Sequence, residues 1–174
     1  GSEALAAVDA AVADPSENVR DEAVSILATW PSNWPEDVEV ADSLLALTES
    51  GQKVSYQVQG VRGYLSYVQE VKNLTDGEKL LKVEELLPAI RRPEEKRLAV
   101  AVVSTIPKTE ALELLMGLAS DPALAEEACL GIVTVAENRA LRTGSKEVRR
   151  KALRMVIETT KSTKTKGKAQ KLLG

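Results

Sequence analysis

Apolar positions recur along the chain at the three-to-four-residue spacing of amphipathic helices, and no segment shows the alternation of a β-strand. Short breaks rich in Pro, Gly, Ser and Asp separate the periodic segments. The pattern predicts an all-α chain of about ten helices. We expect these helices over residues 3–13, 18–30, 36–50, 52–72, 76–92, 93–105, 108–120, 122–141, 145–161 and 163–173.

The breaks between the periodic segments carry helix start signals. Asp14-Pro15 and Asp121-Pro122 each offer an N-cap aspartate followed by a proline, whose missing N–H costs nothing in a first helical turn. Thr75 stands three residues before Glu78, which predicts a capping box. We therefore expect helices to begin at all three places.

Gly and Pro mark the expected helix ends. Gly51 and Gly144 suit the left-handed position that follows a helix. Pro31 and Pro35 predict a stiff turn between the second and third helices.

Residues 98–103 also fit a different structure. Their sequence, LAVAVV, is rich in β-branched residues and would suit a buried strand. The segment follows Pro93, Glu94 and Glu95, however, and a first-turn proline with two carboxylates favours a helix. No second strand is available for pairing, so we predict a helix here.

Taken in pairs, the predicted helices show weak internal repeats. Val19-Arg20 is followed by Ala23, and Val148-Arg149 is followed by Ala152. A small residue in the second helix of each pair recurs at spacings of roughly 30 to 40 residues, as expected for two-helix repeats. These small residues are Ala23, Gly60, Ala99, Ala128 and Ala169.

With these features the chain resembles the HEAT-like repeat family, in which a turn with aspartate, a Val-Arg pair and a downstream alanine mark one helix of each pair. Asp14, Val19, Arg20 and Ala23 match that pattern best. Residues 61–65 and 91–98 also look like segments of HEAT-like modules in large bacterial multidomain proteins. The resemblance implies a right-handed, armadillo-like α-solenoid of about five helical pairs. Such folds bind other macromolecules on a concave face. The length of 174 residues favours one domain over residues 1–174, with two smaller units as the alternative.

Composition limits the kind of core that this chain can build. Hydrophobic residues make up 44% of it, aromatic residues only 3%, and phenylalanine is absent, so Ala, Leu, Val and Ile must fill the core. The single cysteine, Cys129, excludes an internal disulfide and is expected to be a small core residue. No apolar stretch approaches the roughly 20 residues needed to cross a bilayer. Gly1-Ser2 looks like the remnant of a removed tag, which suggests either a segment of a larger protein or a trimmed native N-terminus and leaves localisation unpredicted.

Several kinds of enzyme chemistry are excluded by residue type. The chain has no histidine, so a Ser-His-Asp triad, a histidine base and histidine metal ligands are all impossible. Gly60 and Gly63 lie inside a helical pattern and do not form a phosphate-binding loop. The carboxylate pairs at residues 84–85, 94–95 and 126–127 are interpreted as solvated faces, two of them in first turns where acids stabilise the helix. We predict that the chain is not an enzyme and binds no cofactor.

Two tryptophans stand close together in a chain that is poor in aromatic residues. Trp30 and Trp34 flank residues 31–33, and two indoles on one loop would suit contact with a partner or a sugar ring. The simpler interpretation is that one or both cap the end of the first helical pair. Tyr64 and Tyr67 are three residues apart on one helix face, which predicts packing against a neighbouring helix.

Charge is distributed unevenly along the chain. Residues 1–50 contain eleven acidic side chains and one basic side chain, whereas residues 146–174 contain ten basic and two acidic side chains. In a solenoid the order along the sequence is also the order in space, so each end is expected to attract its own kind of partner.

The favoured function is a protein-interaction or scaffolding module that binds another protein or a neighbouring domain of the parent chain. The alternative is nucleic-acid binding through the basic residues 146–174. The net charge of −3 and the lack of aromatic residues among these bases argue against it. No small-molecule substrate is predicted. The candidate partner-binding residues are Trp30, Trp34, Arg149, Arg150, Lys164, Lys166 and Lys168.

Overall fold

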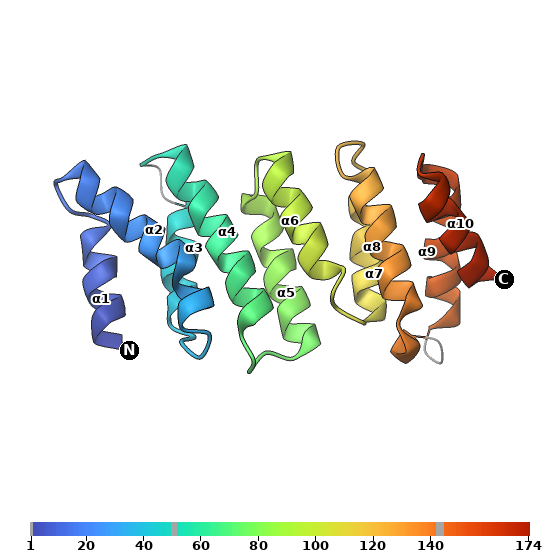
Figure 1. Ribbon diagram of the computed structural model, residues 1–174, viewed down its shortest axis with the longest axis horizontal. Helices are drawn as coiled ribbons and strands as arrows, with labels where there is room; N and C mark the ends of the chain where they lie inside the picture. Colours follow the sequence, from blue (N-terminus) through green and yellow to red (C-terminus); the bar gives the residue numbers. More distant parts are fainter. Residues whose placement is uncertain (1, 50–51, 142–144) are drawn as a thin grey trace. The chain divides into compact units, whose positions relative to one another are not determined.

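The computed structural model describes residues 2–49, 52–141 and 145–174. Within these ranges the chain forms ten α-helices and two short 3₁₀ helices, with no strand (Figure 1). The prediction of an all-α chain is confirmed. Gly51 and Gly144, which we expected to end helices, lie outside the described residues.

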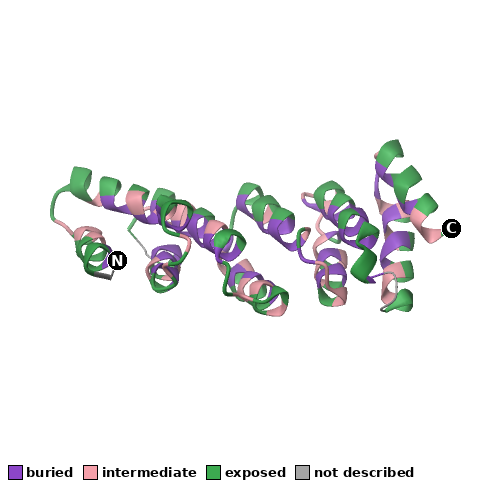
Figure 2. Ribbon diagram, turned by 60° about the horizontal axis from the view of Figure 1, so that its bottom comes forward, coloured by how far each residue is buried: buried purple, intermediate pink, exposed green. Residues whose placement is uncertain are grey.

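Contacts divide the chain into two compact units. Unit 1 comprises Gly1–Leu74 with Pro88–Ile90, and unit 2 comprises Thr75–Leu87 with Arg91–Gly174. In both units Figure 2 shows buried residues concentrated where helices face one another and exposed residues on their outer faces. Each unit therefore has its own core.

Unit 1 contains the first four helices, α1 (Ser2–Ala11), α2 (Glu17–Asn33), α3 (Val40–Glu49) and α4 (Val54–Glu70). Helix α1 packs on α2, α3 packs on α4, and α2 lies against both α3 and α4. In α1 the side chain of Leu5 is buried, while most of the other described side chains are exposed. The centre of this unit is thus the crossing of α2, α3 and α4.

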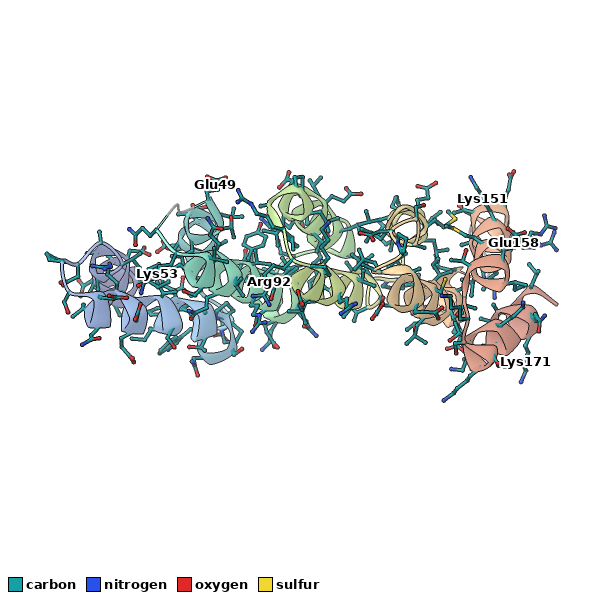
Figure 3. The ribbon with its side chains drawn as sticks, turned by 90° about the horizontal axis from the view of Figure 1, so that it is seen from above. Glu49, Lys53, Arg92, Lys151, Glu158 and Lys171 are labelled. Carbon is teal, nitrogen blue, oxygen red and sulfur yellow. The ribbon has the colours of Figure 1, made fainter. Side chains whose placement is uncertain are left out.

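Unit 2 contains the remaining helices: α5 (Asp76–Leu86), α6 (Pro93–Val103), α7 (Thr109–Leu118), α8 (Ala125–Glu137), α9 (Lys146–Thr159) and α10 (Thr163–Leu173). The 3₁₀ helix η2 (Arg139–Leu141) follows α8, and η1 (Leu87–Ala89), of which Pro88 and Ala89 belong to unit 1, follows α5. Consecutive helices pack as the pairs α5–α6, α7–α8 and α9–α10, and α8 contacts both α6 and α10. Helix α7 likewise contacts α9, so the pairs stack with α5, α7 and α9 in one layer and α6, α8 and α10 in the other (Figure 3).

The five small residues predicted to set helix spacing all lie on the second helix of a pair, namely α2, α4, α6, α8 or α10, and all are buried. Gly60 shows why size matters. A Cβ atom there would lie 2.7 Å from Leu47 Cβ and 2.9 Å from both the Leu44 carbonyl oxygen and the Thr48 amide nitrogen. Only a residue without a side chain lets α4 approach α3 this closely.

The capping box predicted at α5 is confirmed. The Thr75 hydroxyl accepts a hydrogen bond from the Glu78 amide at 3.3 Å, and the Glu78 carboxylate accepts from the Thr75 amide at 2.7 Å. The bond from the Thr75 amide, and secondly a bond from the Thr75 hydroxyl to the same carboxylate at 2.7 Å, hold the pKa of Glu78 below its ordinary value. Both partners therefore satisfy backbone groups that the first helical turn leaves unbonded.

The N-cap role predicted for Asp14 and Asp121 is wrong. Ser16 and Leu124 occupy the N-cap positions of α2 and α8. Each aspartate instead accepts a hydrogen bond from the amide two residues further on, from Ser16 to Asp14 at 2.8 Å and from Ala123 to Asp121 at 2.9 Å. An aspartate side chain that bonds in this way builds a turn ahead of the helix and does not cap its first turn.

The turn predicted between Pro31 and Pro35 is also misplaced, because Pro31 lies inside α2 and the helix continues to Asn33. Pro31 removes one backbone donor, but local bonds continue around it. The Asn33 side chain donates to the Thr29 carbonyl at 3.1 Å, and the Trp34 amide donates to the Trp30 carbonyl at 2.8 Å. Helix α3 consequently begins at Val40, four residues later than predicted.

Two further predictions are confirmed and one is corrected. Residues 98–103 are helical, as part of α6, and Cys129 is buried. Helix α5 ends at Leu86 and not near residue 92, because Pro88 follows and has no N–H for the next helical hydrogen bond.

Candidate functional site

The two tryptophans occupy different environments. Their ring centroids are 4.4 Å apart with planes inclined by 42°. Trp30 is buried, and its indole N–H donates to the Asp37 carboxylate at 3.1 Å. Trp34, directly after α2, is 46% exposed. Trp30 therefore acts as a core residue at the end of α2, and only Trp34 offers its surface to a partner.

The arginines of the two Val-Arg pairs that precede an alanine bind backbone carbonyl groups. Arg20 Nη1 donates to the Asp14 carbonyl at 2.7 Å and to the Pro15 carbonyl at 3.0 Å. Arg149 Nε donates to the Ala136 carbonyl at 3.0 Å, in the last turn of α8. Carbonyl groups at the end of a helix lack partners within it, so a guanidinium there stabilises the helix. Arg149, predicted to bind a partner, thus holds α9 against α8.

The next residue, Arg150, lies in a groove between α7 and α9 that we call the basic groove. Its volume is about 750 Å³. The groove combines four exposed bases with two exposed acids and two half-buried methionines. Its lining is Met116, Lys146, Glu147, Arg150, Lys151, Arg154, Met155 and Glu158. The sequence pattern singled out the bases of α9 but neither methionine. Met116 lies on α7, and only the packing of α7 against α9 brings it beside Met155.

The lysines of α10 do not share this groove. Lys164 and Lys166 are exposed, and Lys168 Nζ lies 3.9 Å from the Glu137 carboxylate of α8. Figure 3 shows Lys151 on the α9 side of unit 2 and Lys171 on the opposite side, at α10. The basic C-terminal residues are therefore divided between two faces.

Glu126 forms a polar link that the sequence pattern did not reveal. Its carboxylate accepts hydrogen bonds from the Lys161 amide and the Thr160 hydroxyl, both at 2.7 Å. These bonds, first that of the backbone amide, hold the pKa of Glu126 below its ordinary value. The link ties the start of α8 to the turn between α9 and α10, so Glu126 has a structural role.

Glu95 corrects the interpretation of the carboxylate pair at residues 94–95 as a solvated face. Its side chain is only 2% exposed, and its carboxylate lies 3.2 Å from Arg92 Nε. Glu94 is exposed and lies 3.5 Å from the same guanidinium nitrogen. A buried carboxylate requires a charged or hydrogen-bonding partner, and Arg92 supplies a positive charge at the start of α6.

A second polar cluster joins α2 to α4 in unit 1. Lys53 bonds to the carboxylates of Glu17 and Asp21, and the Tyr56 hydroxyl also donates to Asp21. These hydrogen bonds, first that of Tyr56 and then that of Lys53, lower the pKa of Asp21. The hydrogen bonds to Glu17 and then to Asp21 raise the pKa of Lys53, so these ion pairs hold the start of α4 against α2.

Unit 1 also has a groove, of about 420 Å³, between α1 and α2. It is lined mainly by small and aliphatic side chains, including Ala7, Val8, Val19 and Ile26, with Glu22 as its one charged residue. This surface lacks the dense charge of the basic groove.

No metal-binding cluster of three or more His, Cys, Asp or Glu residues occurs among the residues that the structure describes. In the same residues we find no helix whose length and hydropathy would let it span a membrane. Comparison of the chain with models of protein families, with curated proteins and with solved structures gave no match.

Proposed function

We propose that the chain is a non-enzymatic protein-binding module, built as a right-handed α-solenoid of HEAT-like helical pairs. Within each unit, the contacts between neighbouring helical pairs and the buried small residue on each second helix support this architecture. The same turn geometry at Asp14 and Asp121, one ahead of α2 and the other ahead of α8, is a further repeated feature. Stacked helical pairs leave an extended surface along one layer of helices, which suits contact with another macromolecule.

The basic groove is the observation that carries this function. Methionine side chains are flexible and adapt to varied apolar surfaces, so Met116 and Met155 supply an apolar floor. Four exposed bases around that floor attract acidic groups and orient them. We infer that the groove binds an acidic segment with apolar side chains, from another protein or from a further domain of the same polypeptide.

Nucleic-acid binding remains the alternative, because ten bases lie within residues 146–174. Three observations favour a protein partner. The bases of α9 and α10 face different sides, Arg149 is already bound to a backbone carbonyl, and the groove contains Glu147 and Glu158 beside its bases. A phosphate backbone would meet carboxylates at the groove and no stacking aromatic side chain.

A binding experiment with two probes tests the proposal. A fluorescent amphipathic peptide of Glu, Leu and Ala represents the acidic partner, and a 20-base-pair DNA duplex represents nucleic acid. The variant Arg150→Glu/Arg154→Glu reverses two exposed charges in the groove. The matched control Lys164→Glu/Lys166→Glu makes the same charge change on α10.

The groove variant should weaken peptide binding by about tenfold or more, while the control changes it by no more than about twofold. Equal losses in both variants would show binding to charge alone and would overturn the assignment of the groove. Tighter binding of the duplex than of the peptide, weakened by both variants, would identify a nucleic-acid-binding protein.

A further inference from the structure

A second groove lies between α5 and α7, on the other side of α7 from the basic groove. Its volume is about 580 Å³, and we call it the acidic groove. Leu81 and Leu114 supply apolar surface, and the surrounding charges are the carboxylates of Glu84, Glu110 and Glu113 with one base, Lys108. Leu81 is 54% exposed, so this apolar surface is accessible.

Helix α7 separates the two grooves and contributes to both. Its buried side chains, Ala111, Leu112 and Leu115, face the core. Its exposed ridge consists of Glu110, Glu113 and Gly117, which are three or four residues apart and therefore on one face.

Gly117 makes the ridge of α7 low. No atom lies within 4 Å of the position that a Cβ would occupy there, so the glycine is not required by packing. Leu114 lines the acidic groove and Met116 lines the basic groove on the two sides of this point. A bound segment can cross α7 over Gly117 and place apolar side chains in both grooves.

The charge of the surface changes sign across α7. Four bases and two acids line the basic groove, whereas three acids and one base line the acidic groove. Packed helices are about 8–10 Å apart, so a segment that crosses from α9 to α5 covers roughly 20 Å. A helix of about 13 residues has this length. Its two ends would therefore meet opposite charges.

We propose, on the basis of the protein-binding function above, that the partner is an amphipathic protein segment whose charge changes sign along its length. Its acidic part lies over the basic groove and its basic part lies over the acidic groove. Its apolar side chains contact Met116 and Met155 at one end and Leu81 and Leu114 at the other. A uniformly acidic segment is disfavoured, because like charges would meet at Glu110 and Glu113.

Three synthetic helical peptides of equal length, with the same apolar positions, test this inference. One is acidic throughout, one has an acidic half and a basic half, and one has the same charges in alternation. Fluorescence anisotropy with the whole chain at low and physiological salt gives the affinities. The two-part peptide should bind about tenfold more tightly than the alternating peptide, because only it matches both grooves.

In the wild type the two-part peptide should bind more tightly than the uniformly acidic peptide, and charge reversal in the acidic groove should reverse this order. In Glu110→Lys/Glu113→Lys both grooves are basic, so the uniformly acidic peptide should bind more tightly than the two-part peptide. The control Glu70→Lys/Glu85→Lys changes two exposed glutamates outside both grooves and should keep the wild-type order. Gly117→Gln should weaken the two-part peptide by about tenfold with no loss of thermal stability, because the new side chain occupies the crossing point on an exposed helix face.

The results separate this inference from the proposed function. Equal affinity for the two-part and alternating peptides, or an unchanged preference in Glu110→Lys/Glu113→Lys, overturns the two-groove inference. The protein-binding function still stands in that case if Arg150→Glu/Arg154→Glu weakens the acidic peptide. Failure of all three peptides to bind the wild type, even at low salt, overturns both.

Discussion

The two units build helical cores from different side chains. All five aromatic residues of the chain, Trp30, Trp34, Tyr56, Tyr64 and Tyr67, belong to unit 1. Unit 2 has none and contains both methionines and the single cysteine. Tyr56, Tyr64 and Tyr67 are buried on α4, and the rings of the last two lie 5.8 Å apart. Unit 2 packs Ala, Val, Leu and Ile instead.

The closely packed glycines of the two units also differ, in the kind of atom that lies nearest to them. Gly60 and Gly63 lie on the same helix as the three tyrosines, and each has backbone atoms of a neighbouring helix about 3 Å from where a Cβ would be. In unit 2 the corresponding atom near Gly131 is the Ser104 hydroxyl, at 2.3 Å, which belongs to a side chain that can rotate. Large rings and rigid close contacts thus occur together in unit 1, whereas the aliphatic core of unit 2 has a more adaptable contact.

Each unit also contains its own probe of unfolding. The tryptophans report on unit 1 by fluorescence. Burial, and secondly the charge of Glu126, raise the pKa of Cys129 to about 11, so its thiol should react with a thiol reagent at pH 8 only when unit 2 opens. Substitutions in either unit can therefore be followed by a signal from that unit alone.

Ala128→Leu should lower the stability of unit 2 by about 3 kcal/mol, because this fully buried position has no space for three further carbon atoms. Faster labelling of Cys129, relative to the wild type, measures the change. Ala101→Leu, at an exposed position of α6, serves as the control and should leave the labelling rate unchanged. An unaltered rate in Ala128→Leu would show that Ala128 does not lie at a packed crossing.

Gly60→Ala should destabilise unit 1 by about 2 kcal/mol, because the new methyl group would press against the backbone of α3. Denaturant titration followed by tryptophan fluorescence gives this value. The matched change Gly131→Ala in unit 2 should cost less than about 1 kcal/mol, measured by Cys129 labelling, since Ser104 can rotate away. Equal costs would contradict the contrast between rigid and adaptable contacts.

Thr160→Val should destabilise unit 2 by about 1 kcal/mol at pH 7, because the Thr160 hydroxyl donates to Glu126 and accepts from the Ser162 amide, and only the bond to Glu126 depends on an ionised group. The pKa of Glu126 is lowered in the folded state, so the stabilisation is present above its ordinary value of 4.5 and is lost as the pH falls through the lowered folded value. Urea titrations of the wild type and of Thr160→Val from pH 7 to pH 3 should therefore show a difference in the free energy of unfolding that shrinks in acid.

Thr134→Val is a suitable control for that series, because Thr134 bonds only to the Leu130 carbonyl of its own helix. Its effect should not change over the same pH range. A difference for Thr160→Val that stays constant down to pH 3 would mean that the ionised carboxylate of Glu126 does not carry the interaction.

Gly117→Ala should raise the stability of unit 2 by roughly 0.5–1 kcal/mol, since alanine favours a helix and no neighbour lies within 4 Å of the new atom. The urea midpoint measures this gain. Loss of stability in Gly117→Ala would contradict the open surface at this point of the α7 ridge.

Several features of this protein follow from the sequence alone. Helical periodicity predicted the all-α structure, and residues 98–103 were correctly assigned to a helix from the Pro-Glu-Glu start before them. The capping box at Thr75 and the burial of Cys129 were also predictable. These features depend on groups within a few turns of one helix, so the local sequence contains the information that determines them.

Only the tertiary structure decided which side chains remain available for binding. Trp30 and Trp34 look equivalent in sequence, yet Asp37 binds one indole while the other stays partly exposed. Arg149 and Arg150 are adjacent, but the end of α8 engages only the first. The two charged grooves combine residues of α5, α7 and α9, which lie up to about 80 positions apart in the chain. Periodicity shows which face of a helix is apolar, but packing determines which helix lies beside it and therefore which charges and apolar side chains meet.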